Sequence, residues 1–196
     1  MADVSMDAWH HWRSVMIGEE AGTELERGFA TLFMNRTNRS GILKGGVIGG
    51  KQQAGKYRLD ARFMREKICE RLKRIGQLSS RINVYEEDAQ SILHRSTEFL
   101  PERTLIYLDP PYYVKGAGLY RNSYKDDDHK KIASLLLTKD FPFPWIVSYD
   151  NAAEIREMYG EASGVSYGLN YTAQRRYVGD EVMYFSDRLS VVPNKI

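Results

Sequence analysis

The chain has 196 residues, 42% of them hydrophobic and 28% charged, with a formal net charge of +2. This length and composition suit one globular domain with a core and a small insertion, and they exclude a disordered chain. No apolar run approaches the ~18 residues of a membrane span, and the first residues lack the pattern of a secretory signal. The single cysteine, Cys69, excludes an internal disulfide and a cysteine-based zinc site, so we expect a cytoplasmic protein.

Two helices are predicted near the N-terminus. Tryptophan and methionine residues at helical spacing predict a short amphipathic helix over 5–16. Thr23 followed by Glu26 has the form of a capping box. Apolar residues on one face then predict a second helix over 24–35, and we expect its aromatic side chains to belong to a core.

Residues 35–59 differ in composition from the rest of the chain, with six glycines, six lysines or arginines and no acid. A loop of this length with no element of its own is usually functional or disordered. Its basic composition suits a phosphate backbone, and a solvated linker is the alternative. The Gly-Gly-x-x-Gly-Gly run at 45–50 does not predict a nucleotide loop, because no clear strand precedes it and no helix follows directly.

A third helix is predicted from Asp60, as its N-cap, to Gly76. The face of this helix that lies opposite its apolar residues is basic, which indicates either a solvated surface or an extension of the basic segment. Residues 82–85 predict a short strand. The helix after this strand has Asp88 as a candidate N-cap.

The most informative stretch is Asp109-Pro110-Pro111-Tyr112, which follows an apolar run at 104–108 that predicts a buried strand. Each proline fixes its own φ and holds the preceding residue extended, so the corner is stiff. It presents a carboxylate, carbonyl groups outside any helix, and an aromatic ring in one place. Ligands of open α/β sheets bind at the carboxyl ends of strands, which favours a site here over a plain Pro-Pro turn.

The rest of the chain alternates between helices and strands. This alternation, which begins at residue 82, predicts an α/β fold with a mainly parallel sheet. We expect His129 to be exposed near the start of a helix. The predicted elements are a helix from Asp126, a buried strand over 145–149, a helix capped by Asn151, and strands over 165–171 and 181–185.

At the Asp-Pro-Pro-Tyr corner the chain resembles the amino-methyltransferases, and its wider context looks like the Dam-like (D12) class of N6-adenine DNA methyltransferases. The exocyclic amine of adenine is a poor nucleophile, because its lone pair is delocalised into the ring. The resemblance implies that a carboxylate and a carbonyl accept the two N–H bonds of this amine. It also implies that an aromatic ring stacks on a base flipped out of the duplex. The catalytic candidates are therefore Asp109, Pro110, Pro111 and Tyr112.

The same resemblance implies S-adenosyl-L-methionine as the methyl donor and double-stranded DNA as the substrate, with no membrane partner. Its cofactor candidates are Asp109, Asp88 and Ala89, and a plain helix cap is the alternative for Asp88. The family has a glycine-rich basic segment after an Asn-Arg opening, and a basic loop before its last strand, where a plain surface hairpin is the alternative. The DNA-binding candidates that match are Arg36, Asn38, Arg39, Lys44, Lys51, Lys56, Arg58, Arg175 and Arg176.

The resemblance covers about residues 20–190, but Met1–Gly22 does not match the cofactor-holding segment with which the family begins. The implied fold is a Rossmann-like methyltransferase sheet that lacks its N-terminal strands, with an inserted helical and loop DNA-recognition region. We expect this recognition region over 1–81 and the C-terminal part of the catalytic domain over 82–196. A missing neighbour of the strand at 104–108 would leave apolar surface and backbone groups exposed.

The hypothesis from the sequence is therefore an N-terminally shortened DNA adenine N6-methyltransferase that is inactive alone or completed by a second polypeptide. A non-catalytic DNA-binding remnant of such an enzyme is the alternative. Methylation of an amide or base in protein or RNA is a third interpretation, which Asp109 and the basic segment disfavour.

Overall fold

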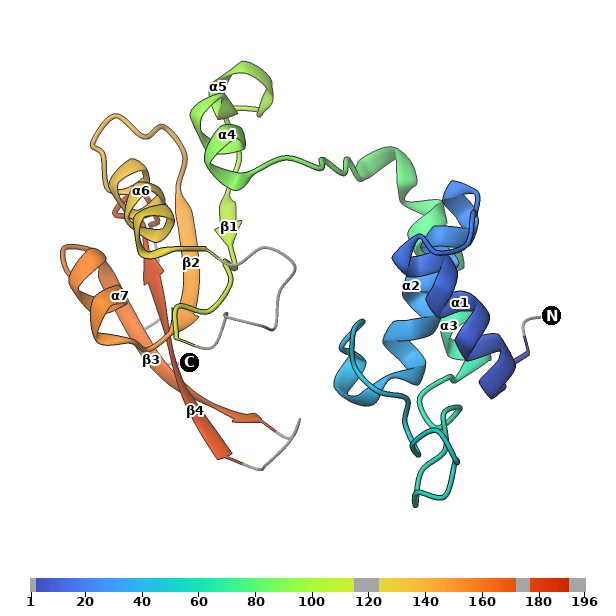
Figure 1. Cartoon of the computed structure of the whole chain (residues 1–196). Coiled ribbons are helices and arrows are strands. Elements are labelled where there is room, and N and C mark those ends of the chain that lie inside the picture. The colour runs from blue at the N-terminus through green and yellow to red at the C-terminus, as the bar shows by residue number, and fades with distance from the viewer. Residues whose placement is uncertain (1–2, 115–123, 172–176, 191–196) are drawn as a thin grey trace. The chain divides into compact units, whose positions relative to one another are not determined.

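The computed structural model describes residues 3–114, 124–171 and 177–190. The chain divides into two compact units, Met1–Val84 and Tyr85–Ile196. This division falls after residue 84, and the sequence predicted one after residue 81. The described helices of the first unit and the sheet of the second can be followed in Figure 1.

The first unit is built on two helices that pack through aromatic side chains. The rings of Trp12 and Phe29 meet edge to face with centroids 4.7 Å apart, and fully buried Phe33 joins the same cluster. The two predicted helices and the Thr23–Glu26 capping box are confirmed. The elements of this unit are α1 (Met6–Ile17), α2 (Glu24–Thr37), η1 (Arg39–Gly41), α3 (Arg65–Gln77) and η2 (Ser79–Arg81).

The glycine-rich segment is braced by side-chain amides. The side chain of Gln53 donates to the carbonyl of Ile48 at 2.7 Å and accepts the amide of Leu59 at 2.9 Å. Gly49 has a φ of +83°, and a Cβ there would lie 2.7 Å from the carbonyl oxygen of Tyr57, so the turn requires glycine. The prediction that this loop has no element of its own is wrong, because it contains the short helix η1.

Helix α3 begins later than the sequence predicted. Phe63 packs against the aromatic cluster, and its amide closes a turn on the carbonyl of Asp60 at 2.8 Å, so the helix starts only at Arg65. Asp60 is therefore not the N-cap. The predicted strand at 82–85 is also wrong, since these residues have no regular structure and Val84 is 89% exposed.

The second unit contains a four-stranded sheet in the order β1-β2-β4-β3 among the described residues. Strand β1 is parallel to β2, whereas β4 runs antiparallel to both β2 and β3. The predicted α/β class is confirmed, but the prediction of a mainly parallel sheet is wrong, because β4 returns antiparallel to β3 before pairing with β2. The elements are α4 (Ala89–His94), α5 (Ser96–Phe99), β1 (Ile106–Leu108), α6 (Asp126–Leu136), β2 (Trp145–Asp150), α7 (Ala153–Met158), β3 (Ser163–Tyr171) and β4 (Tyr177–Phe185).

Helices α6 and α7 cover one face of this sheet (Figure 1) and form the core with it. Trp145, Val147 and Tyr149 alternate along β2 and are at most 3% exposed. The indole of Trp145 donates to the carbonyl of Leu136 at 2.8 Å, which ties α6 to β2. His129 is 1% exposed, which corrects the prediction that it is on the surface.

The helix caps of this unit follow the sequence only in part. The Asp88 side chain accepts the amide of Gln90 at 2.9 Å, so the predicted cap of α4 is confirmed. The N-cap of α7 is Ala152 and not Asn151. Asn151 instead donates to Asp180 at 2.7 Å, because the adjacent strand places an acceptor within its reach. Among the described residues, every helix is too short or too polar to cross a membrane.

Candidate functional site

Asp109 lies exposed just after β1, next to the carboxyl-terminal half of the parallel strand β2. Its Oδ1 accepts the hydroxyl of Ser148 at 3.0 Å. The hydroxyl of Tyr107 lies 2.9 Å from the same Ser148 oxygen. A hydroxyl has one proton to donate, so Tyr107 donates to Ser148 while Ser148 donates to Asp109. This relay orients the carboxylate and leaves it accessible to solvent.

Asp150, at the end of β2, holds the backbone that follows the corner. Its two carboxylate oxygens accept the amides of Tyr113 at 2.7 Å and Val114 at 3.0 Å. Asp150 is 8% exposed, so this buried carboxylate is stabilised by charge-assisted bonds from the main chain. The two prolines restrict the backbone of the corner itself. Asp150, on the neighbouring strand β2, holds the two residues that follow the corner.

Glu181, on β4, holds the ring of the corner. Its Oε1 accepts the hydroxyl of Tyr112 at 2.7 Å, and its Oε2 accepts the hydroxyl of Tyr167 at 3.0 Å. Glu181 is 5% exposed. Burial raises the pKa of Tyr167 well above its usual range, and the hydrogen bond to Glu181 adds to this shift. The Tyr167 phenol therefore stays protonated and donates.

These contacts bring three carboxylates from three strands to one region of the second unit. Asp150 and Glu181 face each other directly across β2 and β4, an arrangement of like charges that costs stability unless each has donors. Asp150 has two backbone amides and Glu181 has two phenols. Asp109 is the exposed member, so it is the carboxylate that can accept N–H groups from a bound molecule.

The cofactor candidates Asp88 and Ala89 lie at the start of α4. Asp88 is exposed, and its carboxylate also caps the helix. Ala89 packs, half-buried, against the core of the second unit. The cap role of Asp88 is therefore confirmed, and cofactor binding by Asp88 and Ala89 stays a prediction.

The basic candidates of the first unit have different surroundings. Arg36 is half-buried at the end of α2, and its Nε is buried without a hydrogen-bond partner among the described residues. Arg39 is exposed, and its Nε donates to the carbonyl of Val47 at 3.3 Å. The other exposed basic residues of this segment are Lys44, Lys51, Lys56 and Arg58.

Asn38 differs from the other DNA-binding candidates because its side chain has no exposed surface. Its Oδ1 accepts the indole of Trp9 at 2.8 Å, and its Nδ2 donates to the carbonyls of Ile42 and Leu43 at 3.0 and 2.9 Å. The predicted contact of Asn38 with DNA is corrected to a role inside the protein, because its donors and acceptor are already used there. Arg175 and Arg176 lie outside the described residues.

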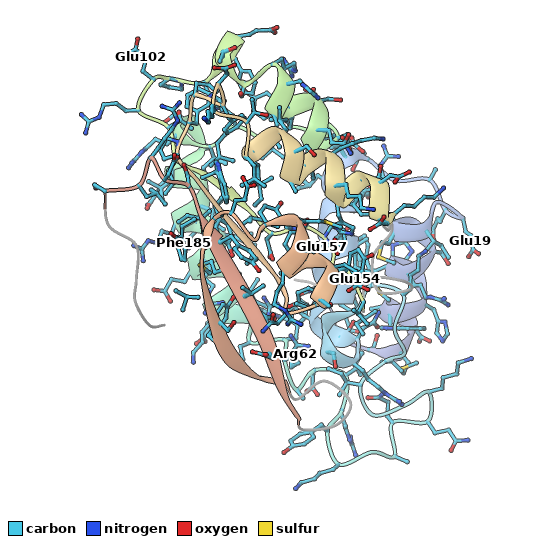
Figure 2. All side chains as sticks on the ribbon, turned by 90° about the vertical axis from the view of Figure 1, so that its left-hand side faces the viewer. Glu19, Arg62, Glu102, Glu154, Glu157 and Phe185 are labelled. Carbon is cyan, nitrogen blue, oxygen red and sulfur yellow. The ribbon has the colours of Figure 1, made fainter. Side chains whose placement is uncertain are left out.

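A cavity of about 370 Å³ lies between α6 and α7. Its lining includes Asp126, Glu154 and Glu157, and Figure 2 shows the last two on α7. None of the predicted site residues lines it. Acidic side chains repel phosphate, so this cavity does not extend the candidate DNA-binding surface.

Sequence reasoning missed Ser148, Asp150 and Glu181 as site residues. A signal for the first two was present: polar residues interrupt an otherwise apolar strand close to its carboxyl end, where ligands of α/β sheets bind. The contact between Glu181 and Tyr112 spans 69 positions. No local pattern encodes it, because it depends on the order of the strands.

One comparison with known families gives a match. The model of the D12 class N6 adenine-specific DNA methyltransferases matches residues 20–173, which include the Asp109 corner and the glycine-rich basic segment. No match was found among curated proteins.

Proposed function

The chain belongs to the D12 class of N6 adenine-specific DNA methyltransferases, and from this premise we propose that its corner prepares the amine of a flipped adenine for methylation. The observation that carries this proposal is the exposed Asp109 carboxylate, which Ser148 orients at the end of β1. Such a carboxylate, together with the Pro110 carbonyl, accepts the N–H bonds of the amine and stabilises the positive charge that develops on it.

The ring of Tyr112 stacks on the target base in this proposal, and Pro111 keeps the ring and the carboxylate in a fixed relation. The hydroxyl of Tyr112 donates to Glu181, so the side chain is held at the backbone and at the hydroxyl. The base reaches the corner only after it leaves the duplex, because the amine of a stacked base is not accessible to a protein side chain.

S-adenosyl-L-methionine is the methyl donor of the proposal, and when bound it supplies an electrophilic methyl group on a positively charged sulfur. The exposed carboxylates of Asp88 and Asp109 fit a cationic molecule with hydroxyl groups, because they accept hydrogen bonds and offset positive charge. Ala89 is half-buried, so its contribution is limited to its backbone and a methyl contact.

In this proposal, duplex DNA is held by the exposed cations of the glycine-rich segment 35–59, which are Arg39, Lys44, Lys51, Lys56 and Arg58. Lys56 lies 5.7 Å from the ring centroid of Tyr57, which is itself 64% exposed. Cations beside an exposed aromatic ring suit a nucleic-acid backbone. Arg36, Arg175 and Arg176 remain predicted contacts.

Substitution of Asp109 tests the proposal. Asp109→Ala removes the acceptor of the amine, so methyl transfer from labelled S-adenosyl-L-methionine to unmethylated duplex DNA of mixed sequence should fall at least ~100-fold. Retention of the same DNA on a filter should stay unchanged. Asp140→Ala, at another exposed acid of the second unit, is the matched control. Equal loss of transfer and retention would contradict the assigned roles.

A non-catalytic DNA-binding protein of this family is the second candidate function, and the open edge of β1 favours it. Among the described strands β1 pairs only with β2, and Leu105 and Tyr107 beside this edge are 53% and 57% exposed. Adenine methylation in cells that express the chain separates the candidates, because it protects DNA from methylation-sensitive restriction enzymes. Protection only when a second polypeptide is co-expressed would support the predicted partner.

A further inference from the structure

Glu181, on β4, is hydrogen-bonded to the aromatic residue of the corner, Tyr112. It is 5% exposed, and both of its carboxylate oxygens accept phenols, from Tyr112 at 2.7 Å and from Tyr167 at 3.0 Å. Tyr167 lies directly opposite Glu181 in the antiparallel pair of β3 and β4. The position of the carboxylate is therefore set by the sheet, and not by the corner that it contacts.

Two ends of Tyr112 are fixed by different parts of the fold. Its backbone follows Pro111 and precedes the two amides that Asp150 accepts. Its hydroxyl is bound to Glu181 on β4. The hydroxyl of a tyrosine lies on the axis of its χ2 rotation, so fixing the backbone and the hydroxyl fixes χ1 and with it the place of the ring.

We propose that Glu181 is a positioning residue, which sets the place of the Tyr112 ring against the target base. This inference rests on the proposed function, in which Tyr112 stacks on a flipped adenine. A stacking ring must lie parallel to the base and at a fixed height for the amine to face the methyl donor. Glu181 acts through Tyr112 and touches neither the base nor the donor in this scheme.

The charge of Glu181 matters as much as its length. An ionised carboxylate only accepts hydrogen bonds, so both phenols donate to it. A glutamine of the same shape has one acceptor and one donor. Glu181→Gln therefore forces one of the two phenols to turn or to lose its partner, with little change in volume.

The test measures methyl transfer to unmethylated duplex DNA in a double-mutant cycle. Glu181→Gln should lower the transfer rate roughly ten- to hundredfold, because a ring displaced by about 1 Å costs this much, whereas DNA retention stays unchanged. In a Tyr112→Phe background, Glu181→Gln should have no further effect, since the hydroxyl through which it acts is gone. Independent, additive losses in the cycle would overturn the proposal.

Two control variants separate positioning from general damage. Tyr167→Phe removes the other phenol from the same carboxylate, so it should leave the transfer rate near that of the wild type. Glu157→Gln makes the same chemical change at an exposed position on α7 (Figure 2). Circular dichroism and thermal melting confirm that each variant is folded. A loss in Tyr167→Phe as large as in Glu181→Gln would count against the proposal.

A second readout needs no substrate and no activity. Ring signals of ¹³C-labelled tyrosines, assigned with Tyr112→Phe and Tyr167→Phe, should move for Tyr112 in Glu181→Gln and stay in place in Glu157→Gln. Unmoved Tyr112 signals would overturn the inference. If the wild-type chain transfers no methyl group to DNA, the proposed function fails, and these signals still decide whether Glu181 fixes the ring.

Discussion

At the scale of single residues, Asn38 shows how one buried amide organises a basic loop. It connects α1, through the indole of Trp9, with the carbonyls of Ile42 and Leu43, from a position without exposed surface. A buried polar group that loses its partner costs about 1–3 kcal/mol. Asn38 therefore holds the part of the basic segment at Ile42 and Leu43 from inside the protein.

Asn38→Ala should lower the free energy of unfolding by about 2–4 kcal/mol, because it removes the acceptor of the Trp9 indole and a donor to the Leu43 carbonyl, whereas the Ile42 carbonyl keeps the amide of Gly45. Urea denaturation followed by tryptophan fluorescence measures this loss. Asn35→Ala is the matched control on the same helix: Asn35 is half-buried and donates once, to Gly41 at 3.1 Å. A loss in Asn38→Ala no larger than in this control would contradict the role.

His129 is a second residue whose environment defines its behaviour. It lies among Tyr113, Tyr124 and Tyr149, with ring centroids 5.3, 5.3 and 5.4 Å away. Burial lowers the pKa of His129, and the carboxylates of Asp128, Asp150 and Asp126 oppose this only in part. The neutral imidazole can then share a hydrogen bond with the Tyr149 hydroxyl at 3.0 Å.

The lowered pKa of His129 predicts a loss of stability in mild acid. The contribution of neutral His129 to the free energy of unfolding is fully present above the ordinary histidine pKa of about 6.5. It declines as the pH falls towards the lower pKa of the folded state, because the unfolded chain takes up the proton first. The urea midpoint should therefore drop between about pH 7.5 and pH 5.5. His129→Gln should flatten this dependence, whereas His94→Gln, at an exposed histidine, should preserve it. An equally steep dependence in His129→Gln would refute the assignment.

At the scale of elements, strand β1 combines a functional corner with an open edge. It supplies Asp109 at its carboxyl end, yet it is the terminal strand of the described sheet. Exposed strand edges pair with other chains unless charges or proline prevent it. Leu105 is 53% exposed beside this edge and offers no charge. The prediction of a buried strand over 104–108 is therefore wrong, because only Leu108 of these residues is buried, and apolar surface is exposed as expected for a strand without its neighbour.

Leu105→Lys should reduce self-association of the chain, because a lysine at a strand edge opposes pairing between copies. Light scattering over a range of protein concentrations measures the effect, and thermal melting should be unchanged. Leu25→Lys, on α2 at a leucine that is 83% exposed, adds the same charge away from any strand. Equal reduction in both variants would assign the effect to net charge instead of the edge.

At the scale of the whole molecule, the distribution of charge says more than its sum. The net charge is only +2, but the segment 35–59 contains six basic residues and no acid. Five of these residues, all except Arg36, are exposed. A local cluster of this kind attracts DNA even when the total charge of the protein is near zero.

Removal of two exposed lysines should change the salt dependence of DNA binding. Lys44→Gln combined with Lys56→Gln should reduce the slope of log K against log salt by about 0.9 for each phosphate that the protein no longer neutralises. Fluorescence anisotropy of a labelled duplex measures this slope at several salt concentrations. Lys139→Gln, at an exposed lysine of the second unit, should leave it unchanged. An unaltered slope in the double variant would exclude both lysines as partners of DNA phosphates.

The sequence by itself determined the features that depend on neighbours along the chain. The Thr23–Glu26 box, the Asp88 cap and the stiff corner at Asp109 follow from residues within a few positions of one another. The resemblance of that corner to the N6-adenine methyltransferases also came from such a short motif, and the family match over residues 20–173 confirms it.

Only the tertiary structure decided which residues support the corner. Ser148 contacts Asp109 from 39 positions away, and Glu181 contacts Tyr112 from 69. The antiparallel placement of β4, the burial of His129 and the internal role of Asn38 were decided in the same way. The physical reason is that local rules fix the backbone within one turn or strand, whereas the register of distant strands and the packing of helices choose the partner of each polar side chain.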